Sequence, residues 1–137
     1  MLVILDTNVL VAAVRSRRGA SFQVVSQIGS DAFDLAVSVP LVLEYESALL
    51  RHLDHTELSE VDVLAIVDFI CLVAKRQPIF LLWRPLLRDP KDDMIAEAAI
   101  AAGCDAVVTH NLADFDALAK FGVKVLSPAL FLREIGG

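Results

Sequence analysis

The sequence predicts an α/β fold, a three-layer α/β/α arrangement with a central parallel sheet. Its 137 residues match the usual size of one domain, so we expect a single domain over residues 1–137. The apolar fraction of 56% exceeds what a sheet with one buried face needs, so several elements should be buried on both sides. Short apolar runs alternate with helical patterns, which favours parallel strands joined by right-handed crossovers.

The first third of the chain predicts two strands and two helices. Leu2–Leu5 is a continuous apolar run that ends at Asp6, and apolar residues at helical spacing follow over Val9–Arg15. After a polar loop, a second helix is expected over about Ser21–Ile28, because a glycine interrupts the pattern there. Phe33–Ser38 is the second strand candidate.

The middle of the chain predicts two further helices and an extended segment. Ser59 and Asp62 have the spacing of a capping box, which marks the start of the second of these helices. The expected ranges are Leu41–Leu53 for the first helix, Ser59 to about Lys75 for the second, and Pro78–Trp83 for the extended segment.

The last third repeats the alternation of strands and helices. Asp89-Pro90 combines a good N-cap residue with a proline at the first helical position, and Gly103 ends that helix. The elements expected after it are a strand at Ala106–Val108, a helix at Asn111–Lys120, a strand at Val123–Leu126, and a final helix capped by Ser127-Pro128.

Composition argues against several classes of protein. No apolar run reaches the roughly 18 residues needed to span a bilayer, and no secretory signal is visible, so we expect a cytoplasmic protein without membrane spans. Cys71 and Cys104 are too few and too poorly spaced for a zinc site or a disulfide framework, so we expect buried free thiols. The net charge of −6 argues against strong non-specific attraction to nucleic acid.

Acidic side chains recur where predicted strands end or helices begin. Asp6 follows the first strand, Glu44 lies one turn into the helix after the second, and Asp92 lies in the first turn of a later helix. Asn111 and Asp114 follow the third interior strand. Taken singly, each has a structural explanation as a helix cap, a solvated residue or an acid favoured by the helix dipole. A parallel sheet, however, would bring them all to one edge.

A cluster of carboxylates at that edge would have chemical consequences. The carboxylates would raise each other's pKa unless a cation compensated their charge. Hard oxygen ligands suit Mg²⁺ or Mn²⁺, so the cluster implies a divalent metal site. Such an ion activates water and stabilises charge on a scissile phosphate, which makes phosphodiester hydrolysis the expected chemistry.

At these positions the sequence resembles the PIN-domain family, in particular the VapC-like toxins of toxin–antitoxin pairs. The resemblance covers essentially the whole chain and rests on the order and separation of four segments. The segments are Val3-Ile4-Leu5-Asp6-Thr7-Asn8-Val9-Leu10, Ser38–Leu50 around Glu44-Tyr45-Glu46, Asp89–Ala98, and Val107-Val108-Thr109-His110-Asn111 with Asp114-Phe115.

The resemblance implies a Mg²⁺- or Mn²⁺-dependent endoribonuclease, with RNA as substrate and a protein antitoxin as partner. The three core metal ligands of the family match Asp6, Glu44 and Asp92, and a shift of one position would exchange Asp92 for Asp93.

The family also implies a fourth ligand after the next strand, and further polar residues that orient the carboxylates or a bound water. Asp114 is our choice for the fourth ligand, with Asn111 as the alternative. The residues that match supporting positions are Thr7, Asn8, Thr109 and Asn111.

Two groups of basic residues could bind phosphates beside the acids, although ordinary loop solvation explains them equally well. One group follows the first helix and the other precedes Asp92. They are Arg15, Arg17 and Arg18, and Arg84, Arg88 and Lys91.

Other functions also fit a parallel sheet of this kind. A phosphotransfer receiver or a haloacid-dehalogenase phosphatase places an Asp after an early strand, but Asn8 stands where the phosphatase pattern requires a second Asp. A non-catalytic module that binds nucleic acid or protein could keep the fold without activity, although no expected acid is missing. The apolar helices Leu41–Leu53 and Val61–Val73 offer surface for a partner or a homodimer.

Overall fold

A parallel sheet forms the centre of the computed structural model, which describes residues 1–78 and 90–136. Within these residues the strands follow the order β3-β2-β1-β4-β5, and every neighbouring pair is parallel. This arrangement confirms the predicted fold class. The strands are β1 (Leu2–Leu5), β2 (Asp34–Val37), β3 (Lys75–Arg76), β4 (Ala106–Val108) and β5 (Lys124–Leu126).

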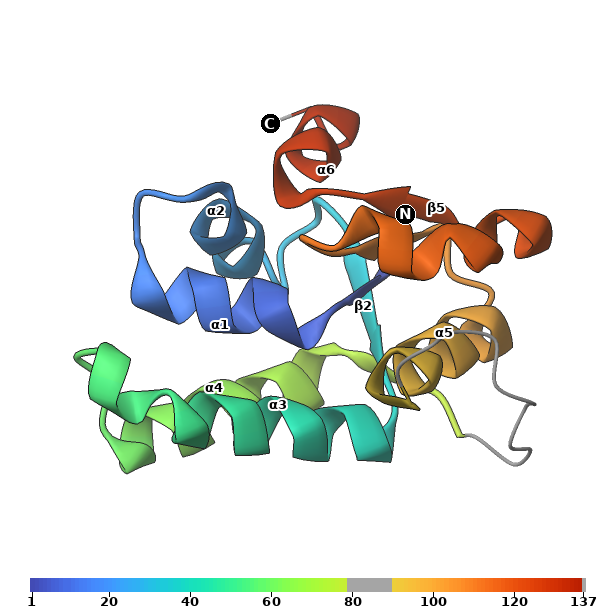
Figure 1. Cartoon of the computed structure of the whole chain (residues 1–137). Helices are drawn as coiled ribbons and strands as arrows, with labels where there is room; N and C mark the ends of the chain where they lie inside the picture. The colour runs from blue at the N-terminus through green and yellow to red at the C-terminus, as the bar shows by residue number, and fades with distance from the viewer. Residues whose placement is uncertain (79–89, 137) are drawn as a thin grey trace.

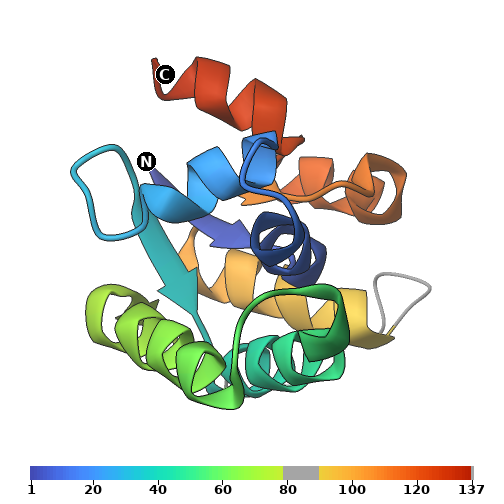
Figure 2. The same cartoon turned by 90° about the vertical axis from the view of Figure 1, so that its left-hand side faces the viewer.

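Helices connect the strands and cover both sides of the sheet. Figure 1 shows α1 and α2 on one side of β2 and α5 on the other, and Figure 2 shows α3 beside α4. The helices are α1 (Thr7–Arg15), α2 (Ala20–Ser26), α3 (Val39–Arg51), α4 (Glu60–Val73), α5 (Pro90–Ala102) and α6 (Pro128–Glu134), with the 3₁₀ segments η1 (Leu53–His55) and η2 (Leu112–Phe121).

The central strand β1 and its neighbour β4 are buried on both faces. In β1, Val3, Ile4 and Leu5 have no exposed surface, although their side chains alternate between the two faces of the sheet. All three residues of β4 are buried in the same way. A sheet covered on one side only would expose every second residue, so the burial explains the unusually apolar composition.

The connections between strands reverse direction at β1. The chain moves outward from β1 through β2 to β3, and then returns to place β4 on the opposite side of β1. Leu5 lies opposite Val108, and the backbone N–H of Asp6 extends the ladder by donating to the Val108 carbonyl over 2.9 Å. In open parallel sheets, ligands bind beyond the carboxyl ends of the strands at such a reversal. The residues that follow β1 and β4 are therefore well placed for function.

Helix caps agree with the sequence at some positions and shift the boundaries at others. The Ser59–Asp62 capping box is present with both of its hydrogen bonds, and the Ser127 hydroxyl caps α6. Helices α1 and α3 each begin two residues earlier than predicted, because Asp6 and Ser38 occupy the N-cap positions directly after the strands. The predicted Asp89 cap lies outside the described residues.

Two predicted elements differ in kind from the structure. Helix α4 ends at Val73, and after Ala74 the two residues Lys75 and Arg76 form the exposed edge strand β3, which is too short to give a sequence pattern. The predicted helix after β4 is the 3₁₀ segment η2, which ends at Gly122 with a φ of 74°. Most of the extended segment predicted at Pro78–Trp83 lies outside the described residues.

Both cysteines are free thiols, as predicted. Cys71 is half-buried, and Cys104 is buried, which raises the pKa of its thiol to about 12. Among residues 1–78 and 90–136, no helix is both long enough and apolar enough to cross a membrane.

Candidate active site: an acidic pocket at the edge of the sheet

An open pocket of about 390 Å³ lies at the carboxyl edge of the sheet, beside β1 and β4. Three of the predicted acids line it, each from a different element: Asp6 after β1, Glu44 in α3, and Asp92 in the first turn of α5. Asp93, the alternative to Asp92, does not line this pocket. Acids far apart in the sequence are thus brought to one place by the fold.

Asp6 is held by the residue that follows the neighbouring strand. Asp6 is only 6% exposed, and the hydroxyl of the fully buried Thr109 donates to its Oδ2 over 2.7 Å. The same hydroxyl oxygen accepts from the backbone N–H of Asn111 over 3.0 Å. Although Asp6 is the N-cap residue of α1, its side chain makes no capping hydrogen bond. The contact with Thr109 therefore gives this carboxylate a partner beyond the first turn of α1.

Burial raises the pKa of the Asp6 carboxyl above its usual value, because the charged form loses its hydration. The Thr109 hydroxyl, the backbone N–H groups of Thr7 and Asn8, and the charge of His110 each lower it in part. A carboxylate in these surroundings favours a bound proton or a bound cation. A divalent ion in the pocket would therefore relieve an existing electrostatic cost.

Glu44 lines the pocket from α3, a helix that is linked to β1 by a buried hydrogen bond. The hydroxyl of Tyr45, which is 1% exposed, donates to the backbone carbonyl of Leu5, the residue before Asp6. Burial, and then the negative charge of Asp6, raise the pKa of Tyr45 well above its usual value, so the hydroxyl stays protonated. This bond holds the helix of Glu44 against the strand of Asp6.

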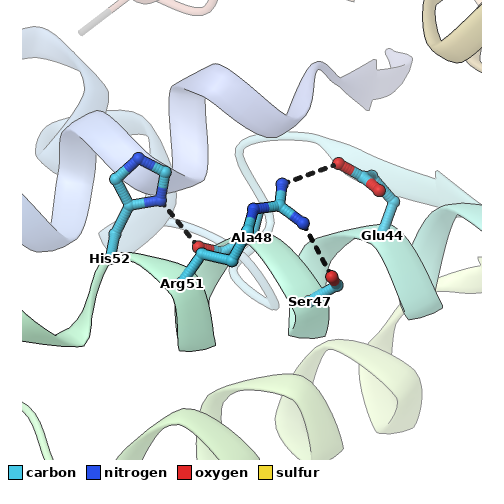
Figure 3. Close-up of polar contacts among 5 residues, drawn as sticks. All are labelled: Glu44, Ser47, Ala48, Arg51 and His52. Carbon is cyan, nitrogen blue, oxygen red and sulfur yellow. Dashed lines mark hydrogen bonds and ion pairs between the residues drawn. The ribbon is translucent and has the colours of Figure 1, made fainter.

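Arg51 and His52 line the same pocket from the carboxyl end of α3 (Figure 3). Nη2 of Arg51 lies 3.4 Å from Oε1 of Glu44, and Nη1 donates to the Ser47 hydroxyl over 2.7 Å. Nδ1 of His52 donates to the Ala48 carbonyl over 2.8 Å. Neither residue was among the predicted site residues. The available signal for Arg51 was its spacing of seven residues from Glu44, which places both on one helix face.

Residues after β4 complete the pocket. Asn111 lines it, whereas Asp114 does not, so the structure brings Asn111 rather than Asp114 to the acids. Oδ1 of Asn8 accepts from the backbone N–H of His110 over 3.4 Å, and the His110 ring hydrogen-bonds the Ser21 hydroxyl at 2.7 Å. These contacts join the starts of α1 and α2 to the end of β4.

The predicted basic groups are only partly placed at the site. Arg15 lines the acidic pocket, and Arg17 lines a larger neighbouring pocket between α1, α2 and α4. Arg84 and Arg88 lie outside the described residues. Ser38, directly after β2, has a structural role, because its hydroxyl accepts from the backbone N–H of Leu41 as the cap of α3.

The donor set of the pocket fits a hard divalent cation. Carboxylate and amide oxygens are the ligands that Mg²⁺ and Mn²⁺ prefer. As the side chains stand, no three His, Cys, Asp or Glu residues of the described part are grouped closely enough to hold an ion. Mg²⁺ usually keeps several waters and binds through one or two carboxylates, so acids that share an open pocket match its needs.

Comparisons with known proteins agree with this architecture. A family model described as PIN domain matches residues 2–113. Among solved structures, a chain in the crystal structure of VapBC2 from Rickettsia felis bound to a DNA fragment from their promoter is similar with a TM-score of 0.61 and 14% identity, over 93% of this chain and 98% of that chain. At that identity the likeness concerns the fold. A search of curated proteins found no match.

Proposed function

This chain belongs to the PIN-domain family, and on that premise we propose that it is a metal-dependent endoribonuclease whose active site is the acidic pocket. The observation that carries the proposal is the convergence of Asp6, Glu44 and Asp92 on one pocket at the strand reversal. The family resemblance supplies the nuclease class and the RNA substrate. The oxygen donors of the pocket support Mg²⁺ or Mn²⁺ as the cofactor.

In this proposal the three acids hold the ion, and Asn111 is a better candidate for a further ligand than Asp114 because it lines the pocket. When bound, the ion would lower the pKa of a water and stabilise charge on the scissile phosphate. The Thr109 hydroxyl keeps the Asp6 carboxylate in place, so little reorganisation is needed when substrate binds.

The acidic charge of the whole chain does not oppose RNA binding at this pocket. The net charge is −6, but Arg15 and Arg51 both line the pocket itself. Single-stranded RNA can be bound through a small number of phosphate contacts together with base stacking. The arginine side chains beside the acids therefore matter more for RNA binding than the net charge of the whole chain.

Cleavage of a mixed single-stranded RNA pool with Mg²⁺, Mn²⁺ or EDTA tests the proposal. Folded Asp6→Asn and Asp92→Asn variants accompany the wild type, and Asp68→Asn, which changes an exposed acid on α4, is the matched control. Metal-dependent cleavage that both site variants lose and the control keeps would support the nuclease. Absence of cleavage, or cleavage that survives both site changes, would favour a non-catalytic binding module.

We further propose a protein antitoxin as partner, as the family resemblance implies, and one similar solved structure is that of VapBC2 bound to a DNA fragment from its promoter. Helix α4 supplies a suitable surface, because Val61, Phe69 and Leu72 are 74%, 47% and 81% exposed. A homodimer could cover the same surface. Light scattering of the purified chain and of the Leu72→Asp variant separates the antitoxin from the homodimer. A wild-type dimer that the substitution disrupts would assign α4 to self-association. A wild-type monomer would leave the α4 surface for the antitoxin.

A further inference from the structure

One arginine of the pocket contacts a candidate metal ligand directly. Arg51 lies two helical turns after Glu44, and its Nη2 is 3.4 Å from Oε1 of Glu44. Both side chains line the pocket that also contains Asp6 and Asp92. Figure 3 shows the guanidinium beside α3, with one nitrogen directed to Glu44 and another to Ser47.

The two contacts of this guanidinium differ in strength. The Glu44 contact at 3.4 Å is longer than the roughly 2.7–2.9 Å of a well-formed bond between charged groups, and the Arg51 side chain is 51% exposed. Exposed ion pairs of this kind are weak. The bond to the neutral Ser47 hydroxyl is shorter, at 2.7 Å, and does not involve the Glu44 carboxylate. Arg51 can therefore leave Glu44 and still remain at the edge of the pocket.

A cation that binds Glu44 would compete with this guanidinium for the same carboxylate. Once the cation has displaced it, the Arg51 guanidinium would face the pocket without the Glu44 carboxylate as its partner. A planar guanidinium binds phosphate oxygens through two parallel N–H donors, which gives a defined orientation to the phosphate.

We propose that Arg51 is a substrate-binding residue that shares Glu44 with the metal. It neutralises Glu44 while the ion is absent and contacts an RNA phosphate when the ion is bound. This inference rests on the proposed nuclease function and adds to it a named contact to the substrate. An arginine in the last turn of a helix also interacts favourably with the helix dipole, so the test must separate that structural role from the proposed one.

The first measurement is the affinity for Mn²⁺, determined by isothermal titration calorimetry without RNA. Arg51→Ala should bind Mn²⁺ about two- to fivefold more tightly than the wild type, because a weak competing ion pair is removed. Arg51→Lys keeps the charge and should stay close to the wild type. Arg133→Ala removes an exposed arginine of α6 and should change nothing. A purely structural role for Arg51 predicts unchanged or weaker Mn²⁺ binding, which would overturn the proposal.

The second measurement is the salt dependence of RNA cleavage. In Arg51→Ala, kcat/KM should fall about tenfold, and the slope of its logarithm against the logarithm of salt concentration should become shallower by about 0.7, as expected for one lost phosphate contact on a single strand. The kcat/KM of Arg51→Lys should lie between the values for Arg51→Ala and the wild type. Arg133→Ala should match the wild type. If Arg51→Ala does not fold, Arg51→Met keeps the apolar stem and replaces it in both measurements.

The two measurements separate this proposal from the nuclease assignment. Wild-type protein that cleaves no RNA would remove the nuclease function, while tighter Mn²⁺ binding by Arg51→Ala would still support the shared use of Glu44. Wild-type cleavage with an unchanged rate and salt slope in Arg51→Ala would overturn the substrate contact and leave the nuclease assignment intact.

Discussion

The two walls of the acidic pocket are built differently. On the strand wall, Asp6 is 6% exposed and Thr109 is fully buried, and a 2.7 Å hydrogen bond joins them. On the α3 wall, the side chains of Glu44 and Arg51 are 19% and 51% exposed and form a longer contact of 3.4 Å. One wall is therefore fixed before any ligand binds, and the other can adjust to what is bound.

The difference follows from the elements that carry each wall. The residues of the strand wall continue two sheet ladders, since the backbone N–H of Asp6 donates to Val108 and that of Thr109 donates to Leu126, each over 2.9 Å. The α3 wall is linked to β1 by the hydroxyl of Tyr45, one residue from Glu44. Substitutions on the strand wall should therefore have larger effects than substitutions on the α3 wall.

The largest effect is expected for Asp6→Asn. Asp6 is a proposed metal ligand on the fixed wall. Its loss should lower RNA cleavage by more than about a hundredfold, which is the upper end of the loss usual for residues that only hydrogen-bond a metal ligand. Initial rates with Mg²⁺, compared with those of Asp68→Asn, measure the loss. Activity within tenfold of the wild type would show that the strand wall does not carry the chemistry.

Thr109→Val should have the next largest effect. Valine has nearly the same shape but cannot donate to Asp6, so Mn²⁺ affinity should fall about 10- to 100-fold, as is usual when an outer hydrogen bond to a metal ligand is lost. Thr109→Ser keeps the hydroxyl and serves as the control. Equal Mn²⁺ affinity in the valine and serine variants would mean that this bond does not position Asp6.

Tyr45→Phe tests the link between the two walls. The change leaves the buried carbonyl of Leu5 without the tyrosine donor, which should lower the free energy of unfolding by about 1–3 kcal/mol. Urea denaturation monitored by circular dichroism gives this value. An unchanged midpoint would mean that α3 is held against β1 by packing alone, and the contrast between the walls would need another explanation.

The smallest effect is the pH dependence of stability without metal. The folded state raises the pKa of Asp6 above 3.8, so as pH rises from 3.8 the unfolded chain loses this proton first and stability falls. The fall is complete above the raised pKa. Asp6→Asn removes this cost, so in EDTA it should unfold at a higher temperature than the wild type at pH 7, with the difference disappearing below pH 3.8. A variant less stable than the wild type at pH 7 would contradict the assigned cause.

The sequence was sufficient to predict the sheet and the convergence of the main acids. Continuous apolar runs such as Leu2–Leu5 identify strands buried on both faces, and parallel strands bring the residues that follow them to one edge. This reasoning predicted that Asp6, Glu44 and Asp92 meet at one edge of the sheet, and all three line one pocket there. The two-residue strand β3 could not be predicted, because so short an exposed segment has no periodicity.

The choice between Asp114 and Asn111 depended on geometry that the sequence does not contain. Asn111 is the N-cap residue before η2, with a φ of −112° and a ψ of 69°, whereas Asp114 lies inside the 3₁₀ segment. Both follow β4 closely in the sequence, so the pattern alone does not say which of them lines the pocket. Arg51 was missed for a different reason: its spacing from Glu44 was visible, but arginines on exposed helix faces are too common for that spacing alone to indicate a site.

Binding of Mn²⁺, followed by electron paramagnetic resonance, tests most directly whether three acids from three elements form one metal site. The wild type would be compared with Asp6→Asn, Glu44→Gln and Asp92→Asn, and with Asp68→Asn as the control. If the three acids form one metal site, each of the three site variants binds Mn²⁺ more weakly than the wild type while the control is unchanged. Mn²⁺ binding that none of the three substitutions weakens would contradict such a site.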